Sequence, residues 1–286
     1  MIITRTVAFT IVILIISTNA YSNDPSATEI LKEVANTYKA MKTYKAEGTI
    51  TEESEINNNK GVVEILFSIL LKKPNQYIIT WTQMDTSPEM GHSVTVWSDG
   101  TQPFFYYRVY NAYYKMTNDE TVLRRVKGLH GPFTIIPLLF LPVFKEHQIP
   151  FSWLKNPKVE KIEKIGEEDC YVISGSSEIS SSENIWISKK SYLVRKYYRF
   201  RNSSDHTNVY LKYLKLNKSK LNFSDEQIEE KMENYKKTKT SSSFTEVYNK
   251  ISSPELNKED FNYTVPKGVV LGDGPNKFKG AGSNLD

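Results

Sequence analysis

The sequence predicts an α+β protein that consists mostly of antiparallel strands. Apolar and polar residues alternate over most of the chain beyond residue 43, as they do in strands with one buried face. Short turn signals, among them residues 57–61 and Asp99-Gly100, separate these runs. An amphipathic helical pattern precedes the first strand. Together these observations predict a meander of strands packed on at least one helix.

The first 22 residues have the pattern of a secretory signal peptide. Arg5 supplies a positive charge, residues 7–16 are almost entirely apolar, and residues 20–22 (Ala-Tyr-Ser) precede the expected cleavage site. The apolar run has about half the length of a membrane-spanning helix, so a retained membrane anchor is the less favoured alternative. The one cysteine, Cys170, lies far from the cleavage site and cannot carry a lipid there. We therefore expect a periplasmic protein that is secreted by a cleaved signal peptide and is not lipid-anchored.

The first helix begins with the pattern of a capping box. In this motif Ser26 and Glu29 each hydrogen-bond the backbone of the other at the start of a helix. Apolar residues then recur on one face, with lysine and glutamate opposite, at Ile30, Leu31, Val34, Tyr38 and Met41. The pattern predicts an amphipathic helix that ends near Lys42 and packs on a sheet.

Strands with one apolar face follow this helix. Residues 44–51 alternate, and the turn at 57–61 leads into a second run, which continues after Pro74 into a third. The apolar members of the second and third runs share one face of the predicted sheet. They are Val63, Ile65, Phe67, Ile69, Leu71, Tyr77, Ile79 and Trp81. Asp99-Gly100 then predicts a hairpin that leads into residues 104–107.

A segment without charges interrupts the strands. Asn118 is expected to cap a short helix before it. Residues 133–144 are uncharged and include Pro137 and Pro142, so one regular helix cannot span them. We expect the apolar side chains of this segment to form either a lid or plug over a cavity, or an ordinary part of the core. They are Phe133, Ile135, Ile136, Leu138, Leu139, Phe140, Leu141 and Phe144.

The second half of the chain resumes the alternation. Strands are expected at residues 159–165, 170–174, 184–188, 192–201, 209–216, 244–251 and 261–265. Ser224 is expected to cap a polar helix over residues 224–237, within an insertion at residues 218–239. Residues 272–286 contain several glycine and asparagine residues and are expected to form a disordered tail. We expect residues 23–271 to form a single domain.

Three stretches carry a resemblance to a known family. They are residues 30–47, with the sequence YKAMKTYKAEGTI from Tyr38 on, EEDCYVISGSS with NIWISKKSYLVRKYYRF in residues 167–200, and residues 245–271. In this order and spacing they resemble the LolA/LolB-like superfamily of periplasmic outer-membrane lipoprotein carriers and lipoprotein-sorting proteins. The resemblance implies a strongly curved antiparallel sheet, an open half-barrel wrapped around helices, with an apolar cavity for acyl chains. It implies that the cavity is lined by Val63, Ile65, Phe67, Ile69, Tyr77, Ile79 and Trp81.

The composition favours a binding protein over an enzyme or a nucleic-acid-binding protein. The chain has a net charge of +4 with lysine and glutamate interspersed, which is typical of a solvated surface. Its histidines lack the spacing of metal ligands, and it contains no Gly-x-Ser-x-Gly motif. We therefore expect no metal site, no cofactor, no catalytic residues and no nucleic-acid partner.

The expected function is that of a monomeric, non-catalytic carrier for lipid or for the acyl chains of lipoproteins. An apolar cavity is sufficient for this function, because burying an acyl chain is favourable by about 0.8 kcal/mol per CH₂ group. The alternative is an envelope-stress sensor or protein-interaction module of the same fold, which binds an envelope membrane protein through its sheet edge. A hydrolase is a third and less favoured alternative.

Overall fold

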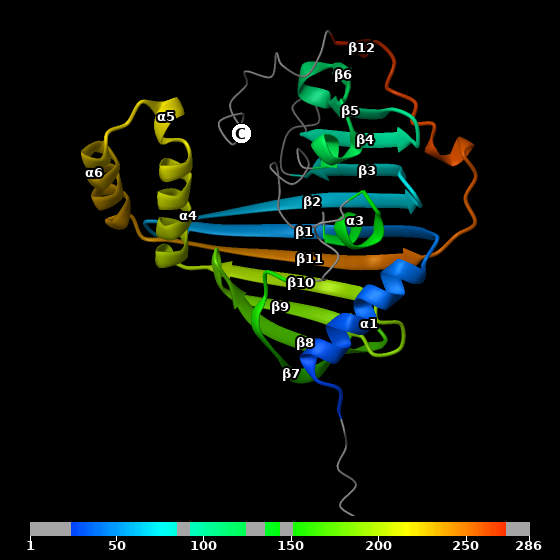
Figure 1. Cartoon of the computed structure of the whole chain (residues 1–286), viewed down its shortest axis with the longest axis horizontal. Coiled ribbons are helices and arrows are strands. Elements are labelled where there is room, and N and C mark those ends of the chain that lie inside the picture. The colour runs from blue at the N-terminus through cyan, green and yellow to red at the C-terminus, as the bar shows by residue number, and fades with distance from the viewer. Residues whose placement is uncertain (1–23, 85–91, 124–134, 144–150, 273–286) are drawn as a thin grey trace, which may run out of the picture.

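The computed structural model describes residues 24–84, 92–123, 135–143 and 151–272. In this part of the chain twelve strands form one sheet, in the order β12-β6-β5-β4-β3-β2-β1-β11-β10-β9-β8-β7 (Figure 1). The strands are β1 (Thr43–Ile56), β2 (Asn59–Lys72), β3 (Gln76–Gln83), β4 (Ser93–Asp99), β5 (Pro103–Tyr107), β6 (Ala112–Lys115), β7 (Lys155–Ile165), β8 (Glu168–Ser177), β9 (Ser180–Ser188), β10 (Val194–Arg201), β11 (Thr240–Ser252) and β12 (Val270–Leu271). The two edge strands, β12 and β7, do not pair with each other, so the sheet is open.

The sheet consists of two meanders that are joined at its centre. β1 to β6 pair in sequence order, and β7 to β11 do the same. The antiparallel pairing of β1 with β11 joins the two meanders, and it contains a β-bulge between Glu47 and Gly48. Neighbouring strands run antiparallel throughout, except that β12 is parallel to β6. The prediction of a mostly β protein with an open antiparallel sheet is confirmed.

α1 (Ala27–Ala40) begins at the capping box that the sequence predicts. Ser26 Oγ accepts a hydrogen bond of 3.3 Å from the Glu29 N–H, and a carboxylate oxygen of Glu29 accepts one of 2.8 Å from the Ser26 N–H. Because these bonds satisfy N–H groups that lack a partner within the helix, they determine where the helix begins. The helix ends slightly before the predicted end at Lys42.

The apolar side of α1 packs on one face of the sheet (Figure 1). Ile30, Val34 and Tyr38 are fully buried, which confirms the predicted amphipathic pattern. The Tyr38 hydroxyl also accepts a hydrogen bond of 3.2 Å from the Val194 N–H of β10. This bond attaches the first helix to a strand from the second half of the chain. We call the face that α1 covers the inner face, and the opposite one the outer face.

The alternation predicted for the second and third runs is confirmed in β2 and β3. Ile65, Ile69, Leu71, Tyr77 and Ile79 all point to the inner face and are buried. The residues that alternate with this apolar set, such as Leu66, Ser68 and Ile78, point to the outer face and are partly or fully exposed. The inner face of these two strands is therefore part of the main hydrophobic core.

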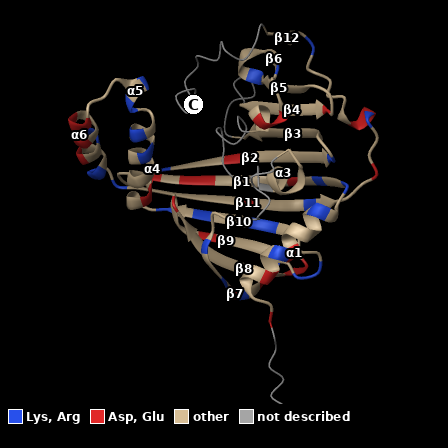
Figure 2. Ribbon diagram, in the orientation of Figure 1, with Lys and Arg blue, Asp and Glu red and all other residues tan. Residues whose placement is uncertain are grey.

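A helical insertion separates β10 from β11. It comprises α4 (Ser203–Leu216), α5 (Lys218–Leu221) and α6 (Asp225–Lys236), which stand beyond one end of the strands (Figure 1). The polar helix predicted after Ser224 is α6, and Ser224 caps it as expected. Figure 2 shows acidic residues concentrated on α6 and basic residues on α4 and α5.

The strand predicted at residues 209–216 is wrong, because these residues belong to α4. A capping box formed by Asn202 and Asp205 starts the helix. Leu214 of α4 then packs with Ile228 and Met232 of α6 in a small core of their own. The capping box and the packing against α6 thus favour a helix here, although the local alternation of apolar and polar residues is typical of a strand.

The strand predicted at residues 261–265 is also wrong. After β11 the chain crosses the outer face, where the 3-10 helix η4 (Glu259–Phe261) lies against β3 and β4. Phe261 is fully buried there, and the Tyr263 ring lies 4.8 Å from the Trp97 ring of β4, centroid to centroid. A segment that lies on the face of a sheet cannot form strand hydrogen bonds with it, because the backbone groups of the strands below are already paired. The segment therefore first pairs with a strand at β12, which hydrogen-bonds to β6.

Candidate functional site

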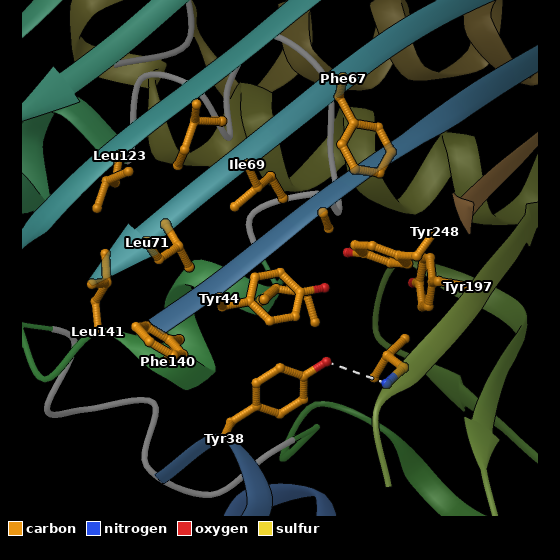
Figure 3. Close-up of a cluster of buried hydrophobic side chains, with 14 of the residues drawn as sticks. Tyr38, Tyr44, Phe67, Ile69, Leu71, Leu123, Phe140, Leu141, Tyr197 and Tyr248 are labelled. Atoms are coloured by element: carbon orange, nitrogen blue, oxygen red, sulfur yellow. Dashed lines mark hydrogen bonds between the residues drawn. The ribbon is translucent and has the colours of Figure 1, made fainter. Parts of the chain in front are cut away.

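The inner face presents a broad apolar surface. Of the residues that the resemblance assigns to a cavity, six are buried in one core and Val63 is partly buried against it; the six are Ile65, Phe67, Ile69, Tyr77, Ile79 and Trp81. Figure 3 shows Phe67 and Ile69 on this surface, with tyrosines of other elements beside them. The structure therefore brings all seven residues together on one face.

α3 (Ile135–Phe140) covers part of the inner face (Figure 1). The described side chains of the uncharged segment are buried or partly buried in the core: Ile136, Leu138, Leu139, Phe140 and Leu141. The Phe140 ring lies 6.3 Å from the Tyr44 ring of β1, centroid to centroid (Figure 3). Phe133, Phe144 and the side chain of Ile135 lie outside the described part of the chain. The described part of the predicted lid thus packs on the sheet.

Lys73 connects the two helices that cover the inner face. Its Nζ donates hydrogen bonds to the carbonyl oxygens of Tyr38 and Lys39, at 2.8 and 2.7 Å, at the C-terminal end of α1. The same Nζ lies 4.7 Å from the centroid of the Phe140 ring of α3. Burial lowers the pKa of the ammonium group. A cation at this end of a helix is also favoured by the helix dipole.

Gly48 allows the Phe67 ring to lie across β1. A Cβ atom at Gly48 would lie 2.1 Å from the Val247 carbonyl oxygen and 2.4 Å from the Phe67 ring, far too close for any larger residue. The Phe67 ring packs edge-on against Tyr248 of β11, with centroids 5.4 Å apart (Figure 3). The β-bulge at Gly48 therefore joins the apolar surface of β2 to the aromatic residues of β11.

Two buried carboxylates lie on the same inner face. Glu183 of β9 is 1% exposed, and one of its oxygens accepts hydrogen bonds from the Tyr197 hydroxyl at 2.7 Å and from Trp153 Nε1 at 3.1 Å. Glu246 of β11 is fully buried, and one oxygen accepts from the Tyr248 hydroxyl. Burial raises the pKa of Glu246 to about 8. The second oxygen of each carboxylate has no hydrogen-bond partner among the described residues.

Sequence reasoning missed both carboxylates, although a signal was present. Glu246 alternates with Phe244 and Tyr248, so its position alone predicts that it points inward. Glu183 likewise alternates with Ile185 of β9. A charged residue in phase with an apolar face is unusual, because an unpaired charge is costly to bury.

Potential metal ligands do not gather among the described residues. No group of three or more His, Cys, Asp or Glu side chains is placed to hold a metal ion in this part of the chain. His92 contacts the Tyr107 hydroxyl and His206 the Ser242 hydroxyl, and His130 and His147 lie outside the described ranges. None of the helices described is long and apolar enough to cross a membrane.

The chain matches the model of one protein family over residues 27–227, described as "Predicted periplasmic protein (DUF2092)". No curated protein matches it. Similar solved structures include an uncharacterized conserved protein from Thermus thermophilus, with 9% identity and a TM-score of 0.41, covering 86% of this chain and 97% of that one. A LolA superfamily protein from Nitrosomonas europaea has 10% identity and a TM-score of 0.30, covering 84% and 98%. LprF from Mycobacterium bovis has 8% identity and a TM-score of 0.33, covering 80% and 96%.

The family description confirms the expected periplasmic location. The cleaved signal peptide stays a prediction, since residues 1–23 lie outside the described part. Because the family model matches more than half of the chain, the chain belongs to the family of predicted periplasmic proteins known as DUF2092.

Proposed function

We propose that this protein is a non-catalytic periplasmic carrier that binds lipid, or the acyl chains of lipoproteins, on its inner face. The observation that supports this best is the position of α3. A short segment without charges lies on the apolar inner face of an open sheet, with Ile136 and Phe140 buried against it. An acyl chain in the same position would gain about 0.8 kcal/mol for each CH₂ group that it buries.

The contacts that hold α3 on the sheet would allow an acyl chain to displace it. Its contacts with the sheet are packing of apolar side chains, together with the Lys73 ammonium over the Phe140 ring. Apolar packing has no preferred direction, so a second apolar body can replace it without leaving polar groups unpaired. The segment can therefore act as core in the empty protein and as a lid in the loaded protein.

Mass spectrometry of an organic extract tests this proposal directly. The protein purified from the periplasm should release a lipid or an acylated peptide. After this lipid has been removed, the protein should bind a fluorescent acyl probe that a natural lipid displaces. A purified protein that contains no lipid and binds no acyl probe would refute the carrier function.

The alternative function, an envelope-stress sensor or protein-interaction module, is favoured by one feature. The insertion α4–α6 has its own apolar core and projects beyond one end of the strands, where a partner protein could reach it (Figure 1). The exposed edge at β7 is less suited to a partner, because its pairing with β8 is irregular and lysine–glutamate ion pairs lie along it. Replacing residues 203–239 by a short linker should abolish co-purification of a partner and leave binding of a neutral acyl probe intact.

A further inference from the structure

Two arginines of β10 lie on the inner face beside the apolar surface. Tyr197, Arg199 and Arg201 alternate along the strand, so their side chains point to the same side. Tyr197 belongs to the main core, and the Arg199 guanidinium carbon lies 5.4 Å from the centroid of the Phe244 ring. Both arginines are partly buried. They occupy the end of β10 that leads into α4 (Figure 1).

These two guanidinium groups lack an acceptor. In the described part of the chain no hydrogen bond or ion pair joins Arg199 or Arg201 to a protein oxygen, and Nε of Arg201 is buried without a partner. Burial, and next the charge of Arg199, lowers the pKa of Arg201 to about 10, although Tyr197, Glu183 and Asp205 act in the opposite direction. Arginine carries five N–H donors, and donors removed from water are rarely left unpaired. The pair thus places two positive charges, with donors that no described protein oxygen accepts, beside the apolar surface.

The neighbouring carboxylates are held by other donors. Glu183, which lies opposite Arg199 in β9, accepts its hydrogen bonds from two other side chains. Asp205, at the start of α4, accepts from two backbone N–H groups. Ser242, opposite Arg201 in β11, lies 3.0 Å from His206 Nε2 and adds a hydroxyl beside the pair. An anion at the arginines would therefore find both charge and hydrogen-bond donors.

We propose that Arg199 and Arg201 bind the anionic head, a phosphate or carboxylate, of an amphiphile whose apolar chain lies on the inner face. The inference rests on the proposed carrier function and specifies the class of ligand. Arginine forms paired N–H bonds that match the oxygens of both anions. Phe244, under Arg199, belongs to the same core as Phe67 and Trp81, so the head and the chain of one molecule can contact adjoining parts of one surface.

A set of probes with the same chain and different heads tests this inference. The assay measures how well each of four compounds displaces a neutral fluorescent acyl probe from the full-length mature protein after its lipid has been removed. The four compounds are dodecyl phosphate, dodecanoate, 1-dodecanol and inorganic phosphate. Charge-assisted hydrogen bonds of this kind predict about ten- to hundredfold tighter binding of the two anionic amphiphiles than of dodecanol. Inorganic phosphate should not displace the acyl probe.

The double variant Arg199→Gln/Arg201→Gln should remove this preference and leave the affinity for dodecanol unchanged. The variant Arg199→Lys/Arg201→Lys should keep part of it. Lys196→Gln is the matched control, because Lys196 lies on the same strand, points to the outer face and covers the Trp186 ring. The glutamine variant should melt close to the parent, since neither guanidinium group has a hydrogen bond or ion pair to lose and the contact of Arg199 with the Phe244 ring is weak; a structural role for the arginines would lower the melting temperature clearly.

The outcomes separate this inference from the proposed function. Equal affinity of the parent protein for dodecanol and dodecyl phosphate, or an unchanged preference in the glutamine variant, would overturn the inference and leave the carrier function standing. Displacement of bound dodecyl phosphate by inorganic phosphate at similar concentrations would assign the arginines to a free anion and also overturn it. If none of the amphiphiles binds, the carrier function itself fails.

Discussion

Replacing Glu246 by glutamine should remove a pH dependence from the free energy of unfolding. Glu246 is fully buried in β11 and receives one hydrogen bond, from the Tyr248 hydroxyl. Burial, partly offset by this bond and by the charge of Arg199, raises its pKa from 4.5 to about 8. Between these pH values the folded protein keeps a proton on the carboxyl group that the unfolded chain has released.

The sign of the effect follows from this proton. Because the folded state binds more protons than the unfolded state between pH 4.5 and about 8, stability falls as the pH rises through this window. The contribution is fully present below pH 4.5 and lost above about 8. A pKa that differs by one between the folded and unfolded states corresponds to about 1.4 kcal/mol, so the whole effect is at most about 5 kcal/mol.

The groups that face Glu246 do not titrate in the same window. They are Tyr248 on its own strand, Tyr197 and Arg199 on β10, Tyr44 on β1 and Tyr38 on α1. Burial raises the pKa of all four tyrosines, so their hydroxyls stay protonated throughout this range. The pH dependence can therefore be assigned to Glu246.

Urea unfolding of the parent protein and of Glu246→Gln between about pH 5 and about pH 9 measures the effect. The amide oxygen of glutamine can still accept from Tyr248, so the comparison changes charge and little else. The stability of the parent relative to the variant should fall by about 1.4 kcal/mol per pH unit and level off near pH 8. Glu229→Gln, on the exposed side of α6, should leave the pH profile unchanged. Parallel profiles for Glu246→Gln and the parent would refute the reasoning.

Two further substitutions test the inner face. Phe140→Asp places a carboxylate without a partner where α3 packs on the sheet, so we expect a loss of roughly 3–5 kcal/mol and weaker binding of an acyl probe, measured by melting and by fluorescence titration. Glu229→Ala is its control, and a Phe140→Asp protein that melts and binds like the parent would show that α3 is neither lid nor core. Gly48→Ala pushes a Cβ atom against the Val247 carbonyl and should lower the free energy of unfolding by about 1–3 kcal/mol in urea. Gly61→Ala on β2, where a Cβ atom meets one serine hydroxyl, should have little effect; equal costs at both glycines would contradict the packing described for Gly48.

Local signals were sufficient to predict β2, β3, α1 and α6. Every second side chain of a strand points to the same side, so the apolar positions from Ile65 to Ile79 could be assigned to one face before any fold was known. Ser26 and Ser224 could be identified as helix caps because their hydroxyls accept from N–H groups within the next turn. Such signals act over a few residues and do not depend on the rest of the chain.

The features that sequence reasoning missed depend on residues far apart in the chain. Residues 209–216 alternate as a strand does, and they form a helix because α6 offers them an apolar face. Nothing near Lys73 indicates that its ammonium group reaches the last carbonyls of α1. The alternation predicts that Glu183 and Glu246 point inward, but the Tyr197 partner of Glu183 comes from the pairing of separate strands.

β1 acquires its second neighbour late when the chain folds from its N-terminal end. The hairpins from β1 to β6 can form as soon as residue 115 is free, whereas β11, which completes the other side of β1, ends at Ser252. Until then one long edge of β1 and one edge of β10 have unpaired N–H and carbonyl groups, and such edges pair readily with other chains. Contacts between residues so distant in sequence also form slowly. The half-built sheet, during export, is therefore the species most exposed to aggregation, and a chaperone that shields strand edges would act on it rather than on the finished protein.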